Sequence, residues 1–126
     1  MTAIGKLSLF ALDCPDALAL ARFYSAITGW PVASEDTAAD DHWVELDPGT
    51  GSVTIAFQQV AGYRPPVWPG SDHPQQAHLD FDVPDLDKAE KQVLTIGARK
   101  GEVQPGETFR VFLDPVGHPF CLVLIR

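Results

Sequence analysis

The chain carries the same sequence pattern twice, and this repeat limits what it can fold into. Residues 13–16 read Asp-Cys-Pro-Asp and are followed by a helical pattern that ends at Gly29. Residues 82–85 read Asp-Val-Pro-Asp and are followed by a second helical pattern that ends at Gly97. Such a repeat predicts two copies of one supersecondary unit, stacked into a single domain. A position that is reactive in one copy and inert in the other then indicates where function has been placed or lost.

Both copies predict the order strand, helix and three strands. The Asp and Pro residues at 13–16 suit the start of a helix, and apolar residues at 20, 23, 24 and 27 form one helical face that ends at a glycine. We place the first module at residues 1–60, an irregular Pro- and Gly-rich linker at 61–75 and the second module at 76–126. The predicted strands span 7–12, 31–34, 42–46, 53–59, 77–83, 99–103, 109–113 and 120–125, and the second helix spans 86–96.

Charge and composition narrow the classes of partner. The net charge of −8 disfavours binding to nucleic acid and to anionic membrane surfaces, and it favours either a cationic small molecule or simply a soluble surface. No apolar run approaches the roughly 20 residues that span a bilayer, and the N-terminal residues lack the pattern of a signal peptide. We therefore expect a cytoplasmic protein in which Cys14 and Cys121 are reduced thiols.

The strand predicted at 77–83 carries the most reactive side chains. Alternation places His78, Asp80 and Asp82 on one face and the apolar residues of the strand on the other, which we expect to face the helix. A His beside an Asp can act as a metal ligand or a general base. The alternative interpretation is a hydrogen-bonded structural His.

Several of these segments together resemble the vicinal oxygen chelate superfamily, which includes glyoxalase I, bleomycin-resistance proteins and extradiol dioxygenases. The resemblance covers essentially the whole chain, and residues 63–70 resemble a bacterial glyoxalase-like subgroup. It implies an α+β fold of two βαβββ modules that form a cup-shaped, open mixed β-barrel with the helices outside, and it implies a homodimer. The segments that carry it are Phe23-Tyr24, Gly29-Trp30, Ala-His-Leu-Asp at 77–80 and Asp-Pro-Val-Gly-His-Pro at 114–119.

The resemblance also implies where a metal would bind. Metal enzymes of the superfamily take ligands from the first and last strand of each module, and His78 matches the first-strand position of the second module. The repeat places Leu9 at the same position of the first module, and Leu cannot bind a metal. The last-strand positions fall on Cys121 and near Gln58. No metal cofactor is therefore favoured, although a divalent metal is possible with His78, Cys121 and Gln58 as ligands.

Two classes of function follow. In the preferred one, the protein binds a small organic molecule in the cup, in the manner of the drug-binding branch of the superfamily. In the alternative, it is a lyase or isomerase of the glyoxalase type that depends on a metal or uses His78 as a base, with His78 and Asp80 as catalytic residues. A purely structural interaction module is disfavoured, because a polar pair facing into the cup costs free energy unless it is used. The predicted ligand-binding residues are the aromatic residues Trp43, Phe57, Tyr63 and Trp68 and the polar residues Gln58, Arg64 and Cys121, together with the His-Asp pair.

Overall fold

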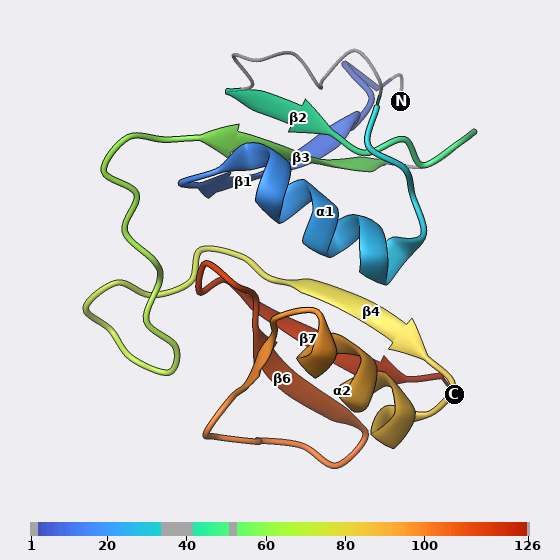
Figure 1. Cartoon of the computed structure of the whole chain (residues 1–126), viewed down its shortest axis with the longest axis vertical. Helices are drawn as coiled ribbons and strands as arrows, with labels where there is room; N and C mark the ends of the chain where they lie inside the picture. The colour runs from blue at the N-terminus through green and yellow to red at the C-terminus, as the bar shows by residue number, and fades with distance from the viewer. Residues whose placement is uncertain (1–2, 34–41, 51–52, 126) are drawn as a thin grey trace. The chain divides into compact units, whose positions relative to one another are not determined.

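The computed structural model describes residues 3–33, 42–50 and 53–125 and divides the chain into two compact units (Figure 1). We call Met1–Tyr63 module one and Arg64–Arg126 module two. The division falls inside the segment predicted as a linker, because most of that segment packs on module two. The expectation of a single domain stays a prediction.

Module one contains one helix and three strands: β1 (Leu9–Cys14), α1 (Ala17–Thr28), β2 (Trp43–Glu45) and β3 (Thr54–Gln59). The sheet order is β1-β3-β2, in which β1 runs parallel and β2 antiparallel to β3. The strand predicted at 31–34 is reduced, within the described residues, to a single bridge between Val32 and Leu46, and its last residue lies outside the described part of the chain.

Helix α1 begins and ends where its sequence predicts. The Asp16 side chain accepts a hydrogen bond from the backbone N–H of Ala19 at 3.1 Å, which satisfies one unpaired donor of the first turn. Gly29 ends the helix with φ of +75°, a conformation that favours glycine. Tyr24 is fully buried and stacks on Phe57 of β3 with ring centroids 5.7 Å apart, so α1 covers one face of the sheet.

Module two repeats this arrangement with one more regular strand. Its strands β4 and β7 are parallel neighbours, as β1 and β3 are in module one, and the sheet order is β4-β7-β6-β5. The described residues thus confirm the predicted α+β fold of two βαβββ modules. Neither helix within them is long and apolar enough to cross a membrane. The elements are β4 (Leu79–Val83), α2 (Leu86–Thr95), β5 (Arg99–Lys100), β6 (Phe109–Leu113) and β7 (Pro119–Leu124).

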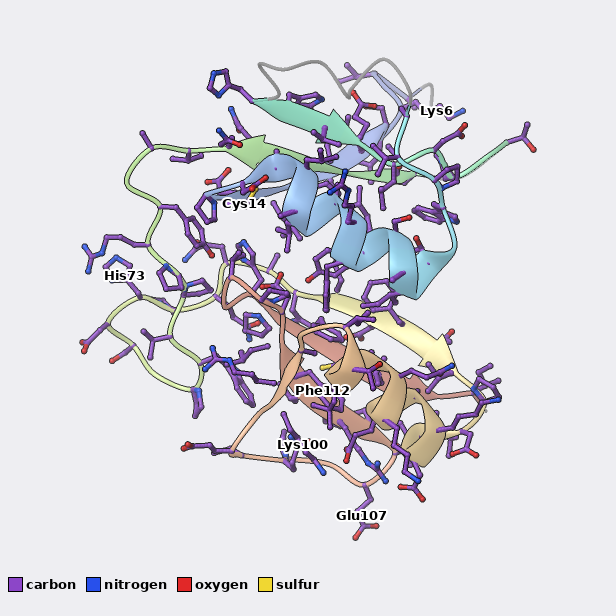
Figure 2. The ribbon with its side chains drawn as sticks, in the orientation of Figure 1. Lys6, Cys14, His73, Lys100, Glu107 and Phe112 are labelled. Atoms are coloured by element: carbon purple, nitrogen blue, oxygen red, sulfur yellow. The ribbon has the colours of Figure 1, made fainter. Side chains whose placement is uncertain are left out.

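The module two sheet presents two different faces. On the face that meets α2, Phe112 stacks on Phe120 with centroids 5.7 Å apart (Figure 2 labels Phe112). Arg110 lies on the same face, and its guanidinium contacts Glu90 at 3.2 Å. Lys100, also labelled in Figure 2, contacts the same carboxylate at 3.0 Å. Both basic side chains therefore form ion pairs with α2. The residues next to them along β5 and β6 point to the opposite face of the sheet.

The segment at 64–75 packs on module two and is more than a tether. Gly117, in the turn between β6 and β7, has φ of +99°, and a β-carbon there would lie only 2.8 Å from Cβ of Pro65. A β-carbon on Gly101 would lie 3.5 Å from Cζ3 of Trp68. Glycine at 117 lets Pro65 approach the turn closely, and the Trp68 ring lies at ordinary contact distance from Gly101.

Candidate functional site: a His–Asp–Cys cluster

Three side chains of module two that carry reactive groups lie close together. His78 Nε2 is 3.2 Å from Asp80 Oδ1. The donor atoms of His78, Asp80 and Cys121 all lie within 4.8 Å of one another. We call these three residues the His–Asp–Cys cluster. Three such groups together can bind or transform a ligand through several contacts at once.

Strand pairing explains how distant residues meet. In the parallel ladder of β4 and β7, Asp80 lies directly beside Cys121, and across the next ladder Cys121 lies beside Val111. His78 precedes Asp80 by two residues and so shares its face. This face is opposite to that of Phe112 and Phe120, because residues next to one another along a strand point to opposite sides. The cluster therefore lies on the sheet face away from α2.

The cluster combines exposed and buried groups. The side chains of His78 and Asp80 are 42% and 55% exposed, whereas Cys121 is only 8% exposed. Val111 beside the thiol is buried too. A molecule that approaches this face meets an imidazole and a carboxylate first, above an apolar floor that contains the thiol.

Burial raises the pKa of Cys121 to about 11, and the negative charge of Asp80 and a hydrogen bond to its carboxylate act in the same direction. The thiol is therefore protonated at neutral pH and donates its hydrogen to Asp80. The same carboxylate lies beside the His78 ring, so Asp80 connects the other two members. This arrangement can orient an imidazole for hydrogen bonding or for proton transfer.

We predict that Cys121 is a poor nucleophile in the metal-free protein. With a pKa of about 11, about one thiol in a thousand is ionised at pH 8, and alkylation should be roughly a hundredfold slower than that of an ordinary cysteine. Replacing Asp80 with Asn should speed the reaction only several-fold, because burial is the largest cause of the shift and remains. Iodoacetamide labelling followed by mass spectrometry of the Cys121 peptide measures this rate. Asp82→Asn is the matched control, and a wild-type rate like that of a free thiol would contradict the prediction.

The repeat shows that module one lacks such a cluster. Asp13 and Asp82 each lie three residues before the Asp that caps the following helix, so Leu9 corresponds to His78 and Ala11 to Asp80. Ala11 pairs with Ala56 in the ladder of β1 and β3. All three corresponding positions of module one are therefore apolar.

This register makes one sequence prediction more specific. The module-one counterpart of Cys121 is Ala56, two residues from Gln58, near which the sequence placed it. Gln58 lies two residues further along β3, beside Asp13, and so corresponds to Val123 beside Asp82. Helical caps predict the alignment of the first strands well. The last strands do not follow at the same spacing, because Ala56 lies 40 positions after Asp16 whereas Cys121 lies 36 positions after Asp85.

The other predicted ligand-binding residues of module one differ in exposure. Gln58 is exposed, and Trp43 lies opposite it in the ladder of β2 and β3, with its indole N–H donating to Glu45 at 2.9 Å. Phe57, in contrast, is fully buried against Tyr24. Neighbouring residues of a strand point to opposite faces, so Phe57 points to the helix side when Gln58 points away from it. Phe57 is therefore a core residue. Tyr63 is half-buried.

In module two, two residues predicted to bind ligand lie outside the cluster. Trp68 is half-buried over Gly101, and Arg64 is exposed. Among the described residues, Cys121 is the predicted ligand-binding residue that lies beside the His-Asp pair. Sequence alternation predicts the shared face of His78 and Asp80, but it carries no signal for the position of Cys121 beside them.

The paired βαβββ modules, each with its first and last strands side by side, define a protein of the vicinal oxygen chelate class. The model of the glyoxalase-like domain family matches residues 9–123, and the chain belongs to this family. A comparison with curated proteins gives no match.

Solved structures with the same fold share little sequence with this chain. A glyoxalase/bleomycin resistance protein/dioxygenase family enzyme from Burkholderia phytofirmans PsJN is 20% identical, with a TM-score of 0.71 over 97% of this chain and 100% of that one. The fosfomycin resistance protein FosX from Mesorhizobium loti is 20% identical, with a TM-score of 0.63 over 96% and 92%. The antibiotic-binding protein TnmS3 from Streptomyces sp. CB03234 is 17% identical, with a TM-score of 0.62 over the full length of both. At these identities the likeness shows the fold alone.

The superfamily implies a divalent metal, and the donor set of this chain fits that group only in part. At the module-one positions that correspond to His78 and Cys121, Leu9 and Ala56 offer no side-chain lone pair. The His–Asp–Cys cluster, however, offers nitrogen, oxygen and sulfur, which are the ligand atoms that zinc takes in proteins. A metal held there would supply Lewis-acid activation of a bound oxygen.

Proposed function

We propose that this glyoxalase-like protein binds a small organic molecule on the face of the module two sheet that carries the His–Asp–Cys cluster. The observation that carries the proposal is the convergence of an imidazole, a carboxylate and a thiol above a buried apolar floor. Small-molecule sites combine apolar walls with a few polar groups of this kind. His78 and Asp80 would orient the ligand, and Cys121 would contact it from below.

The charge of this face favours a ligand with a positive or hydrogen-donating group. Asp80 and Asp82 share the face, whereas Lys100 and Arg110 are paired with carboxylates of α2 on the other one. Arg99 shares the cluster face, but it lies on β5 at the far edge of the sheet. Relatives of the same fold include an antibiotic-binding protein and a fosfomycin resistance protein, and these names support a role in binding antibiotics or metabolites.

The predicted ligand contacts outside the cluster are part of this proposal. Each stays a proposed ligand-binding residue within its own module: Gln58, Trp43 and Tyr63 in module one, and Arg64 and Trp68 in module two. We propose in addition that the protein acts in the cytoplasm, as its sequence pattern suggests, and as a homodimer, as its family resemblance implies. Analytical ultracentrifugation measures the oligomeric state directly.

A second function is favoured by the His78–Asp80 distance of 3.2 Å. A carboxylate at this distance can orient an imidazole and stabilise its protonated form, which is what a general base requires. The protein would then be a lyase or isomerase of the glyoxalase type. His78 would remove a proton from the bound substrate and return it to another atom, with Asp80 holding the ring.

Ligand binding by wild-type and variant proteins tests the proposed function. Amide NMR spectra should be recorded with a panel of cationic, neutral aromatic and phosphonate molecules. We expect at least one compound to shift resonances of β4 and β7 and to bind about tenfold more weakly to His78→Ala, since losing one polar contact costs about 1.4 kcal/mol. His73→Ala, in the same module but outside the cluster, is the matched control. Ligands whose affinity is unchanged by His78→Ala would refute a site at the cluster.

A further inference from the structure

We propose that His78, Asp80 and Cys121 form a zinc-type metal site that lies entirely within module two and leaves a coordination position open. The three donor atoms lie within 4.8 Å of one another before any metal is bound. Nε2 of His78 and Oδ1 of Asp80, at 3.2 Å, are already about as close as two ligands of one tetrahedral ion. Small side-chain rotations of His78 and Asp80, both exposed, bring the remaining pairs to that separation.

The ligand types select the metal. A thiolate and an imidazole favour zinc and similar transition ions, whereas magnesium and calcium require oxygen ligands. Three protein ligands leave the fourth tetrahedral position for water or an organic oxygen, as in sites that do chemistry and not in purely structural ones. The exposure of His78 and Asp80 gives an ion access to the position above Cys121.

This site differs from the ligand set that the superfamily resemblance implies. That set takes ligands from both modules. The two ligand positions of module one are occupied by Leu9 and Ala56, whose side chains cannot bind a metal. Asp80, on the strand beside Cys121, supplies the third ligand from within module two. The sequence alone predicts Gln58, on a strand of module one, as the third ligand.

The binding step is balanced by the release of one proton. The divalent ion accepts lone pairs from the imidazole nitrogen and the carboxylate oxygen. The S–H bond of Cys121 breaks, its electron pair forms the metal–sulfur bond, and the proton passes to solvent. No electron is gained or lost, and no oxidant or reductant takes part.

Cobalt and zinc titrations of the untagged full-length chain, kept reduced, test the proposal. We expect one cobalt ion per chain, with a sulfur-to-cobalt charge-transfer band in the near ultraviolet that zinc abolishes by displacement. Cys121→Ser should remove the band, and His78→Ala and Asp80→Asn should each weaken binding by at least about tenfold, since even residues that only support a ligand cost that much. Asp82→Asn, on the same strand and face but outside the cluster, should bind cobalt as the wild type does.

A measurement on the wild-type protein tests the site even if the variants fail to fold. Zinc should protect Cys121 from alkylation in proportion to its occupancy of the site, and it should leave the labelling of Cys14 in module one unchanged. Binding weaker than about 100 µM, a cobalt spectrum without the sulfur band, or equal binding by Cys121→Ser would overturn the metal site. These outcomes leave the proposed function intact, because that function is tested by organic ligands in the absence of metal.

Discussion

Replacing Phe112 with Ala is expected to lower the free energy of unfolding of module two by about 3–5 kcal/mol. Phe112 is fully buried and stacks on Phe120, at the place where α2 covers the sheet. The substitution removes a large apolar side chain and leaves a cavity, and the stacked ring loses its partner. Urea denaturation followed by circular dichroism measures the loss.

The control for Phe112 is Val103→Ala. Val103 is 47% exposed, so its truncation should change the free energy of unfolding by less than about 0.5 kcal/mol. A loss below about 1 kcal/mol for Phe112→Ala would show that the helix face of the sheet is not the core of module two.

The second large effect is expected at Asp114, whose replacement by Ala should cost about 2–4 kcal/mol. Asp114 is fully buried, and its Oδ1 accepts hydrogen bonds from the backbone N–H groups of Val116 and His118, each at 2.9 Å. Removing the carboxylate leaves both donors without this acceptor inside the turn that joins β6 to β7. The turn positions the start of β7, so the register that brings Cys121 to Asp80 should loosen as well.

The repeat provides a matched control for Asp114. Asp47 of module one begins the equivalent Asp-Pro turn, but it is exposed, and within residues 42–50 its side chain accepts the N–H of Gly49 at 2.9 Å. Asp47→Ala should therefore cost less than about 1 kcal/mol. Thermal unfolding of both variants compares the two turns directly. Equal losses would mean that burial of Asp114 contributes nothing to the stability of its turn.

Much of the fold could be predicted from local sequence because its signals act over a few residues. Asp16 and Asp85 cap helices at the positions where their sequence pattern indicates, and each caps by accepting an N–H three residues ahead. The glycine at 29 ends α1 as predicted. These interactions lie within one turn of the helix, so residue type and spacing suffice to predict them.

The positions of the predicted site residues could be predicted only where the signal was equally local. His78 lies just before β4 and two residues before Asp80, and alternation alone places the two on one face. Phe57 illustrates the limit, because its aromatic character suggested ligand binding, whereas its parity in β3 turns it into the core against Tyr24. Gln58 illustrates the same limit for register, since the pairing of β1 with β3 makes Ala56 the counterpart of Cys121.

The sequence by itself determined the two βαβββ modules, the limits of their helices and the His-Asp pair on one face of the chain at β4. Those features follow from capping, periodicity and alternation, which are properties of neighbouring residues. The tertiary structure alone decided that Cys121 lies beside Asp80 and that Pro65 and Trp68 pack on module two. These contacts join residues far apart in the chain, and they depend on strand register and close packing, for which no local pattern in the sequence encodes a signal.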